Sequence, residues 1–180
     1  DQLFITTYGK GIWQLDGDIL KRVRFRELAQ IDDIYDALFD QQGRLWLATD
    51  NGIWIYQSQS PESLSHIGQD QGLPDEIVTQ LEMSVNGDIW IGLYDHGLAY
   101  YDTDRDIVIP LMLLQPSLGN VIGLCIGQPG EGWMATEKSI VRYHQDGSSK
   151  EIKLPSEMKD RVGGLLYDVN ANLLVANGNK

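Results

Sequence analysis

The chain has 180 residues, of which 42% are hydrophobic and 22% charged, and 14 Lys and Arg against 26 Asp and Glu give a formal net charge of −12 at pH 7. This charge would repel a nucleic-acid backbone, and it disfavours an anionic membrane surface as a partner. The sequence contains no apolar run of about eighteen residues and no signal segment. We therefore expect these residues to encode neither a targeting signal nor a membrane-spanning segment.

A short phrase that opens on an aromatic residue recurs along the chain. Four copies begin at Phe4, Trp46, Trp90 and Trp133, and a degenerate fifth begins at Leu174. Successive copies are 42, 44, 43 and 41 residues apart. A period of about 40 to 45 residues is the length of one four-stranded propeller blade. The sequence therefore predicts an all-β fold, a partial β-propeller of four-stranded antiparallel blades with a repeat of about 43 residues.

Each copy is predicted to form strands joined by hairpins. In the second copy we expect a first strand at residues 34–39, a second at 45–49 and a third at 53–56, and the unbroken apolar run of the second strand indicates burial on both faces. No window shows a helical period. A weaker fourth strand is expected in successive copies at residues 23–25, 65–67, 107–109 and 151–154.

The whole chain, 1–180, is interpreted as one partial propeller. Its blades are expected at approximately 34–68, 77–113 and 121–154, flanked by blade remnants at 1–28 and 162–180. The chain starts and stops on second strands, which favours the interpretation that it is one part of a longer propeller. An open arc exposes apolar blade faces, so we expect self-association or cover by a partner copy.

The residues that repeat are assigned to the core. The same place in each repeat is occupied by Trp46, Trp90 and Trp133. A residue type that recurs at one repeat position is expected to stabilise the fold. The single cysteine, Cys125, lies in an apolar run, can form no internal disulfide and is predicted to be a buried core residue.

Motifs for metal, cofactor or catalytic chemistry are not found. The three histidines, His66, His96 and His144, show no ligand spacing. No Gly-rich phosphate loop, Ser-His-Asp order or repeated carboxylate pair stands out. We therefore expect no metal, no cofactor and no catalytic residues.

The repeated phrase resembles a known family. The pattern Asp-x-x-Gly-x-x-Trp-x-x-Thr-x-x-Gly-Ile is complete at residues 40–53, and Gly-Leu-Pro-Asp-Glu-Ile-Val at 72–78 leads from one blade into the next. Both resemble the two-component regulator propeller repeat. The third copy departs from the pattern at Ser84 and Leu93, and the fourth departs at Gly127 and Ser139.

The resemblance implies a sensor region of a bacterial membrane-bound signalling protein. Such repeats form the extracytoplasmic part of hybrid histidine kinases and diguanylate cyclases. On this basis the chain would be periplasmic and non-catalytic, and its own output domain, a kinase or a cyclase, would lie outside these 180 residues.

Two alternatives remain open. The first is a structural scaffold that passes the state of a neighbouring domain through protein contacts. The second is an enzyme, because the segment 40–46 also resembles the Asp-box of sialidases. That reaction needs an Arg cluster, whereas Arg22, Arg24 and Arg26 crowd one outer strand and no Arg recurs at one loop position.

The ligand site is predicted on the loop face, because a binding site breaks repeat symmetry. The turns between the second and third strands read Tyr-Gly-Lys, Asp-Asn, Tyr-Asp-His and Glu-Lys in successive copies. Aromatic rings and hydrogen-bond acceptors suit a small molecule or an oligosaccharide. The candidate ligand-binding residues are Tyr8, Lys10, Asp50, Asn51, Tyr94, Asp95, His96 and Glu137.

Overall fold

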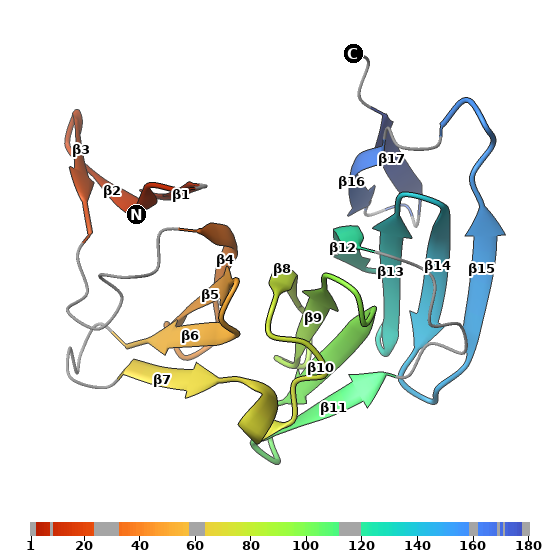
Figure 1. Ribbon diagram of the computed structural model, residues 1–180, viewed down its shortest axis with the longest axis horizontal. Helices are drawn as coiled ribbons and strands as arrows, with labels where there is room; N and C mark the ends of the chain where they lie inside the picture. The colour runs from red at the N-terminus through yellow and green to blue at the C-terminus, as the bar shows by residue number, and fades with distance from the viewer. Residues whose placement is uncertain are drawn as a thin grey trace.

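Five antiparallel sheets follow one another around an open arc in a computed structural model of the chain (Figure 1). Apart from one 3-10 turn, η1 (Gln69–Gln71), every regular element described is a strand, which confirms the all-β prediction. No helix among these residues is long and apolar enough to cross a membrane. The structure describes residues 3–7, 9–23, 33–57, 64–111, 120–158, 162–168, 170 and 172–177.

Each sheet is one propeller blade, numbered I to V along the chain. Blades II, III and IV have four strands each, blade I has three, and the described part of blade V has two. Blades I and II consist of β1 (Leu3–Thr7), β2 (Gly11–Asp16), β3 (Ile19–Arg22), β4 (Ile34–Phe39), β5 (Leu45–Thr49), β6 (Ile53–Tyr56) and β7 (Leu64–Ile67). Blades III to V consist of β8 (Val78–Met83), β9 (Ile89–Leu93), β10 (Leu98–Asp102), β11 (Ile107–Leu111), β12 (Val121–Ile126), β13 (Glu131–Thr136), β14 (Ser139–His144), β15 (Ser149–Lys153), β16 (Val162–Tyr167) and β17 (Leu173–Asn177).

The predicted first, second and third strands of the second copy are confirmed, since β4, β5 and β6 have the expected bounds. The fourth strand of the first copy begins earlier than predicted, and the backbone N–H of Val23 still donates to Ile12 O of β2 at 2.9 Å. This strand was expected at residues 23–25, but β3 runs from Ile19 to Arg22, because Gly17 adopts a positive φ of 61° and turns the chain back directly after β2. Residues 24 and 25 lie outside the described residues.

The first strands of blades II to V share one irregularity on the inner side of the arc. β4, β8, β12 and β16 contact one another in turn, and each has a shift of register after its first residue (Figure 1). Such a bulge inserts one unpaired residue and redirects its side chain. The bulge residues are Tyr35, Thr79, Ile122 and Gly163.

Aromatic residues of the second strands are wedged between neighbouring blades. Trp46 and Trp90 are fully buried, and the rings of Tyr101 and Tyr143, from the third strand of the next blade, lie 5.0 and 6.4 Å from them. Trp133 is only partly buried, so the expectation of three equally buried Trp residues is wrong for this one. Among the described residues, blade V contributes aliphatic side chains and no aromatic ring to the cluster that Trp133 packs against.

We therefore expect unequal losses of stability from Trp90→Ala and Trp133→Ala. The first removes a fully enclosed ring and should lower the free energy of unfolding by roughly 3 to 5 kcal/mol. The second removes a ring already in contact with solvent and should cost about 1 to 2 kcal/mol. Urea unfolding of both variants measures the difference, and equal losses would contradict this account of the blade junctions.

The Asp that opens each repeat phrase organises the hairpin between the first and second strands. Asp40 Oδ1 accepts hydrogen bonds from the backbone N–H groups of Gln42 (2.9 Å) and Arg44 (2.8 Å), and its Oδ2 accepts from Trp46 Nε1 (2.7 Å). Burial raises the pKa of Asp40, but the hydrogen bonds from Trp46 and Arg44 outweigh it and hold this pKa below its usual range. The residue is thus an ionised support for the turn and for the indole.

The two copies that lack this Asp differ in how they treat the indole N–H. In blade III, Ser84 replaces the Asp, and Trp90 Nε1 is buried with no hydrogen-bond partner in the described part of the chain. In blade IV, Gly127 replaces the Asp, yet Trp133 Nε1 donates to Glu131 Oε1 at 2.7 Å. A Cβ atom built on Gly127 would overlap the same Glu131 oxygen. Glu131 therefore fills the space of the missing Asp from four residues further along.

Variants that move the carboxylate from position 131 to position 127 test whether Glu131 replaces the missing Asp. Glu131→Ala should cost about 1 kcal/mol, because the indole N–H of the partly buried Trp133 exchanges this acceptor for water. Gly127→Asp alone should also destabilise, since two carboxylates would compete for one space. The double variant should recover most of the loss, and a double-mutant cycle by urea unfolding gives the coupling energy. Additive losses in the double variant would show that the two positions do not substitute for each other.

Candidate functional site

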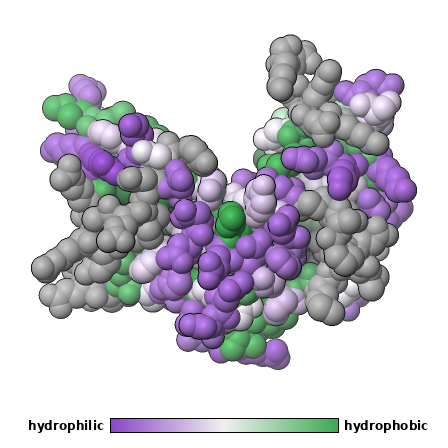
Figure 2. Space-filling view, in the orientation of Figure 1, coloured by the Kyte–Doolittle hydropathy of each residue, from purple (hydrophilic) through white to green (hydrophobic). Residues whose placement is uncertain are grey.

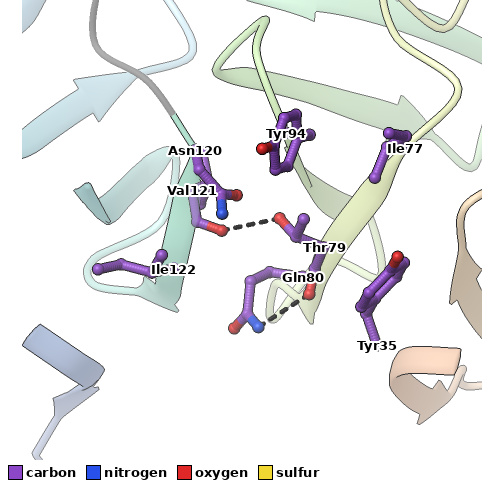
Figure 3. Close-up of a pocket in the computed structure, with 8 residues that line it drawn as sticks. All are labelled: Tyr35, Ile77, Thr79, Gln80, Tyr94, Asn120, Val121 and Ile122. Carbon is purple, nitrogen blue, oxygen red and sulfur yellow. Dashed lines mark hydrogen bonds between the residues drawn. The ribbon is translucent and has the colours of Figure 1, made fainter. Parts of the chain in front are cut away.

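A pocket of about 370 Å³ opens on the inner side of the arc, where blades II, III and IV meet (Figure 3). Its walls come from the first strands of these blades, the segments that lead into β8 and β12, and the turn after β9. The residues that line it are Tyr35, Ile77, Thr79, Gln80, Tyr94, Asn120, Val121 and Ile122.

The shared bulge explains why strand residues line this pocket. Three of the lining residues, Tyr35, Thr79 and Ile122, are the bulge residues of three consecutive blades. Thr79 Oγ1 donates a hydrogen bond to Val121 O at 2.8 Å and lies 3.3 Å from Gly92 O, so it joins blade III to blade IV beside the pocket (Figure 3). The bulges thus turn backbone-paired strands into a lined recess.

The lining chemistry is neutral and mixed. Tyr94 is 44% exposed and offers an aromatic surface, while Gln80 and Asn120 contribute amides. Asn120 Oδ1 is buried with no hydrogen-bond partner among the described residues. No lining residue is charged. An apolar platform with a few placed polar groups is typical of sites for small neutral molecules.

The turn that carries Tyr94 is held from outside its own blade. Asp75 Oδ2 accepts hydrogen bonds from the backbone N–H of Asp95 (3.0 Å) and from the His96 ring Nδ1 (3.2 Å). The backbone N–H of Tyr94 donates to Ile77 O at 3.0 Å. Burial raises the pKa of Asp75, but its hydrogen bonds with the N–H groups of Ile77 and Asp95 and with His96 together keep this pKa below its usual range.

The structure brings one of the sequence-predicted site residues into the pocket, namely Tyr94. Asp95 and His96 follow it in the same turn but do not line the pocket. The corresponding turns of blades I, II and IV carry exposed side chains that do not line it either, namely Lys10, Asp50, Asn51 and Glu137. Tyr8 lies outside the described residues. Ligand binding by the turn residues stays a prediction.

The other lining residues were missed because the repeats were read as core strands. The available signal was the polar pair Thr79-Gln80 inside a first strand that is mostly apolar in the other copies. The bulge itself leaves no common residue type. In the described ranges, no group of three or more His, Cys, Asp and Glu side chains is arranged to hold a metal ion.

A second polar group on the inner strands links blades II and III. Asp36 Oδ1 accepts from Ala37 N at 2.8 Å, and its Oδ2 accepts from Leu81 N of the next blade at 2.9 Å. Burial raises the pKa of Asp36. Burial and then the Asp36 charge raise the pKa of Glu82. Asp36 therefore supports the blade junction, whereas the partly buried carboxyl group of Glu82 beside it is desolvated and repelled by the Asp36 charge.

The predicted burial of Cys125 is confirmed, since the residue is 6% exposed on β12. Burial, followed by the nearby Glu82 charge, raises the pKa of its thiol to about 12. At neutral pH the group is therefore a thiol rather than a thiolate, and the thiolate is the nucleophilic form.

Glu82→Gln should raise the melting temperature at pH 7. A carboxyl group whose pKa is raised on folding stabilises the fold when protonated, and this contribution is lost as pH rises through the folded-state pKa. The amide stays neutral, so its advantage over wild type should shrink as pH falls from 7 toward the usual Glu pKa of about 4.3 and should be small below it. Glu151→Gln, on the exposed strand β15, is the matched control. An equal gain from the control, or a gain independent of pH, would refute the explanation.

The strand order, the repeated bulge and the wedged aromatics define a partial antiparallel β-propeller. Solved structures agree. The chain matches the extracellular domain of a one component system from B. thetaiotaomicron, BT4673, with a TM-score of 0.76 and 22% identity over 97% of its length. It matches that of a hybrid two component system, BT3049, from the same organism with a TM-score of 0.76 and 18% identity over 98%. At these identities the likeness shows the fold alone.

The family comparison locates the repeat itself. Residues 30–51 match the two component regulator propeller family, which confirms the resemblance drawn from the sequence. Virginiamycin B lyase from Staphylococcus aureus has a similar fold, with a TM-score of 0.67 and 19% identity over 80% of this chain and 48% of the lyase. The chain spans 24% of the length of each of the two extracellular domains. A comparison with curated protein sequences gives no match.

Proposed function

We propose that this chain is part of the extracytoplasmic sensor propeller of a bacterial signalling protein and that it binds a ligand without transforming it. The regulator propeller repeat and the similarity to extracellular domains of one and two component systems support this proposal. The output domain, a kinase or a cyclase, lies outside these residues, and the propeller is periplasmic.

The observation that carries the binding role is the pocket at the junction of three blades. Its bulge residues occupy one repeat position but are Tyr35, Thr79 and Ile122, so a common fold has left their side chains free to differ. Tyrosine rings, a hydroxyl and amides without charge suit a neutral molecule that carries hydroxyl or amide groups. The ligand is a small neutral molecule or an oligosaccharide.

A protein-interaction scaffold is the second candidate, and one observation favours it. The outer face of blade I exposes a row of apolar side chains on paired strands, Leu3, Leu15 and Leu20, with Ile5 beside it. The equivalent residues of blade II, Leu45 and Leu47, are buried at the junction with blade I. This face of blade I therefore suits a further blade or a second copy of the chain. Self-association, expected from the sequence, stays a prediction for this face. The likeness to a lyase concerns the fold, and we draw no reaction from it.

A thermal-shift screen separates the two candidates. The probes are neutral cello-, xylo-, malto- and chito-oligosaccharides, and a compound that binds the folded state raises the melting temperature by mass action. A scaffold gives no shift with any probe. Figure 2 shows the face to be probed, with hydrophilic surface over blade III and the arc open between blades I and V.

Tyr94→Ala should weaken binding of the stabilising oligosaccharide by about two- to tenfold, because a stacked ring is worth about 0.5 to 1.5 kcal/mol. The free energy of unfolding should change by no more than about 0.5 kcal/mol, since the side chain is exposed. Glu137→Ala is the matched control, because Glu137 occupies the same turn position in blade IV but does not line the pocket. Loss of binding in the control with none in Tyr94→Ala would place the ligand on the turn face instead.

A further inference from the structure

The turn between the second and third strands is normally held by a Thr of its own blade. In blade II, Thr49 Oγ1 donates to Gly52 O at 2.9 Å and accepts from Asn51 N at 3.1 Å. In blade IV, Thr136 Oγ1 accepts from Lys138 N at 3.2 Å. This hydroxyl closes the turn within the blade and explains why the repeat phrase contains a Thr.

Blade III lacks this hydroxyl, and another residue has taken its place. Leu93 stands where blades I, II and IV have Thr7, Thr49 and Thr136. The backbone N–H that the Thr would bind, that of Asp95, donates to Asp75 Oδ2 instead, at 3.0 Å. Asp75 belongs to the segment that leads from blade II into blade III, where its Oδ1 also accepts from Ile77 N at 3.1 Å. The hydrogen bond to this turn amide thus comes from the connection between blades, while the backbone N–H of Leu93 still closes the turn on Gly97 O at 2.9 Å.

The blade with the altered hold is also the one whose turn residue lines the pocket. Tyr94 precedes the amide that Asp75 binds, and its own N–H donates to Ile77 O at 3.0 Å. Ile77 lines the pocket together with Tyr94, whereas Asp75 does not. The adjacent Glu76 O accepts from Gly52 N of the blade II turn at 2.6 Å. Residues 75–77 therefore fasten the turns of two blades beside one pocket.

We propose that Asp75 is a positioning residue for the pocket, which holds the Tyr94 ring in its binding position without touching the ligand. The proposal rests on the proposed function of that pocket. In the protein without ligand, the order of the turn at residues 94–97 depends on the Asp75 carboxylate.

Two readouts on the full chain test this role in Asp75→Ala. The first is amide hydrogen exchange without ligand, which should quicken at residues 94–97 and stay unchanged in the strands of blades II and IV. The second is titration with the cello-, xylo-, malto- or chito-oligosaccharide that stabilises the wild type, whose affinity should fall by no more than in Tyr94→Ala, that is by up to about tenfold. Asp75→Asn keeps an acceptor oxygen and should recover part of both effects. Asp70→Ala, an exposed acid in the same connection, should change neither.

The outcomes separate the two proposals. Unchanged exchange at residues 94–97 in Asp75→Ala overturns the positioning role whatever the oligosaccharides do. Faster exchange throughout the chain, with a matching fall in the urea midpoint, also overturns it, since Asp75 would then support the whole fold. Local exchange changes with no oligosaccharide bound by the wild type leave the positioning of the turn standing and count against the proposed ligand class.

Discussion

The packing of one aromatic ring from each complete blade against the next blade determines where the other parts of this structure lie. Trp90 shows how close this contact is, because a Cβ added at Gly132 of blade IV would come within 2.5 Å of the indole ring. Only a residue without a side chain lets the two sheets approach so closely at this point. Tyr143 then covers the ring from the third strand. The angle and spacing between blades follow from this packing of a large side chain into the space left by a glycine.

The site depends on the same spacing. With the blades wedged at a fixed distance, their first strands lie side by side on the inner side of the arc, and every bulge falls at the same height. Thr79 Oγ1 can therefore reach Val121 O of the neighbouring blade at 2.8 Å. In the same way, Asp36 Oδ2 reaches Leu81 N at 2.9 Å across the preceding junction. The pocket is a consequence of blade packing at a place where the bulge residues are unlike.

The sequence predicts the strands that recur in each repeat, but not the residues that replace a lost member of the repeat pattern. The period and the apolar runs identify β4, β5 and β6 to the residue, because these strands are buried and their pattern recurs in each copy. The loss of Asp at position 127 is visible in the sequence, but its replacement by Glu131 is not. That exchange depends on two side chains sharing one space, which spacing along the chain does not encode.

The candidate site is only partly predictable for a related reason. Turn residues that are equivalent in sequence, such as Asp50 and Glu137, lie on different blades, and the rotation between blades places them apart from the pocket. The bulge has no residue signature either, since Tyr, Thr, Ile and Gly all occupy it. Tyr94 was found because its turn differs from the others, which is the one property of a site that a repeat sequence reveals.

Leu93, in place of the Thr of the repeat pattern, has two effects on the junction between blades II and III. The Leu side chain is fully buried in the cluster that contains Trp46, so the change strengthens the apolar junction between blades II and III. It also removes the hydroxyl that accepts from the turn amide in blade II, and the Asp75 carboxylate from the inter-blade connection replaces it. The same connection binds the blade II turn, since Glu76 O accepts from Gly52 N at 2.6 Å. A change at Tyr94 is thereby linked mechanically to blade II, and this link arises where the repeat departs from its own pattern.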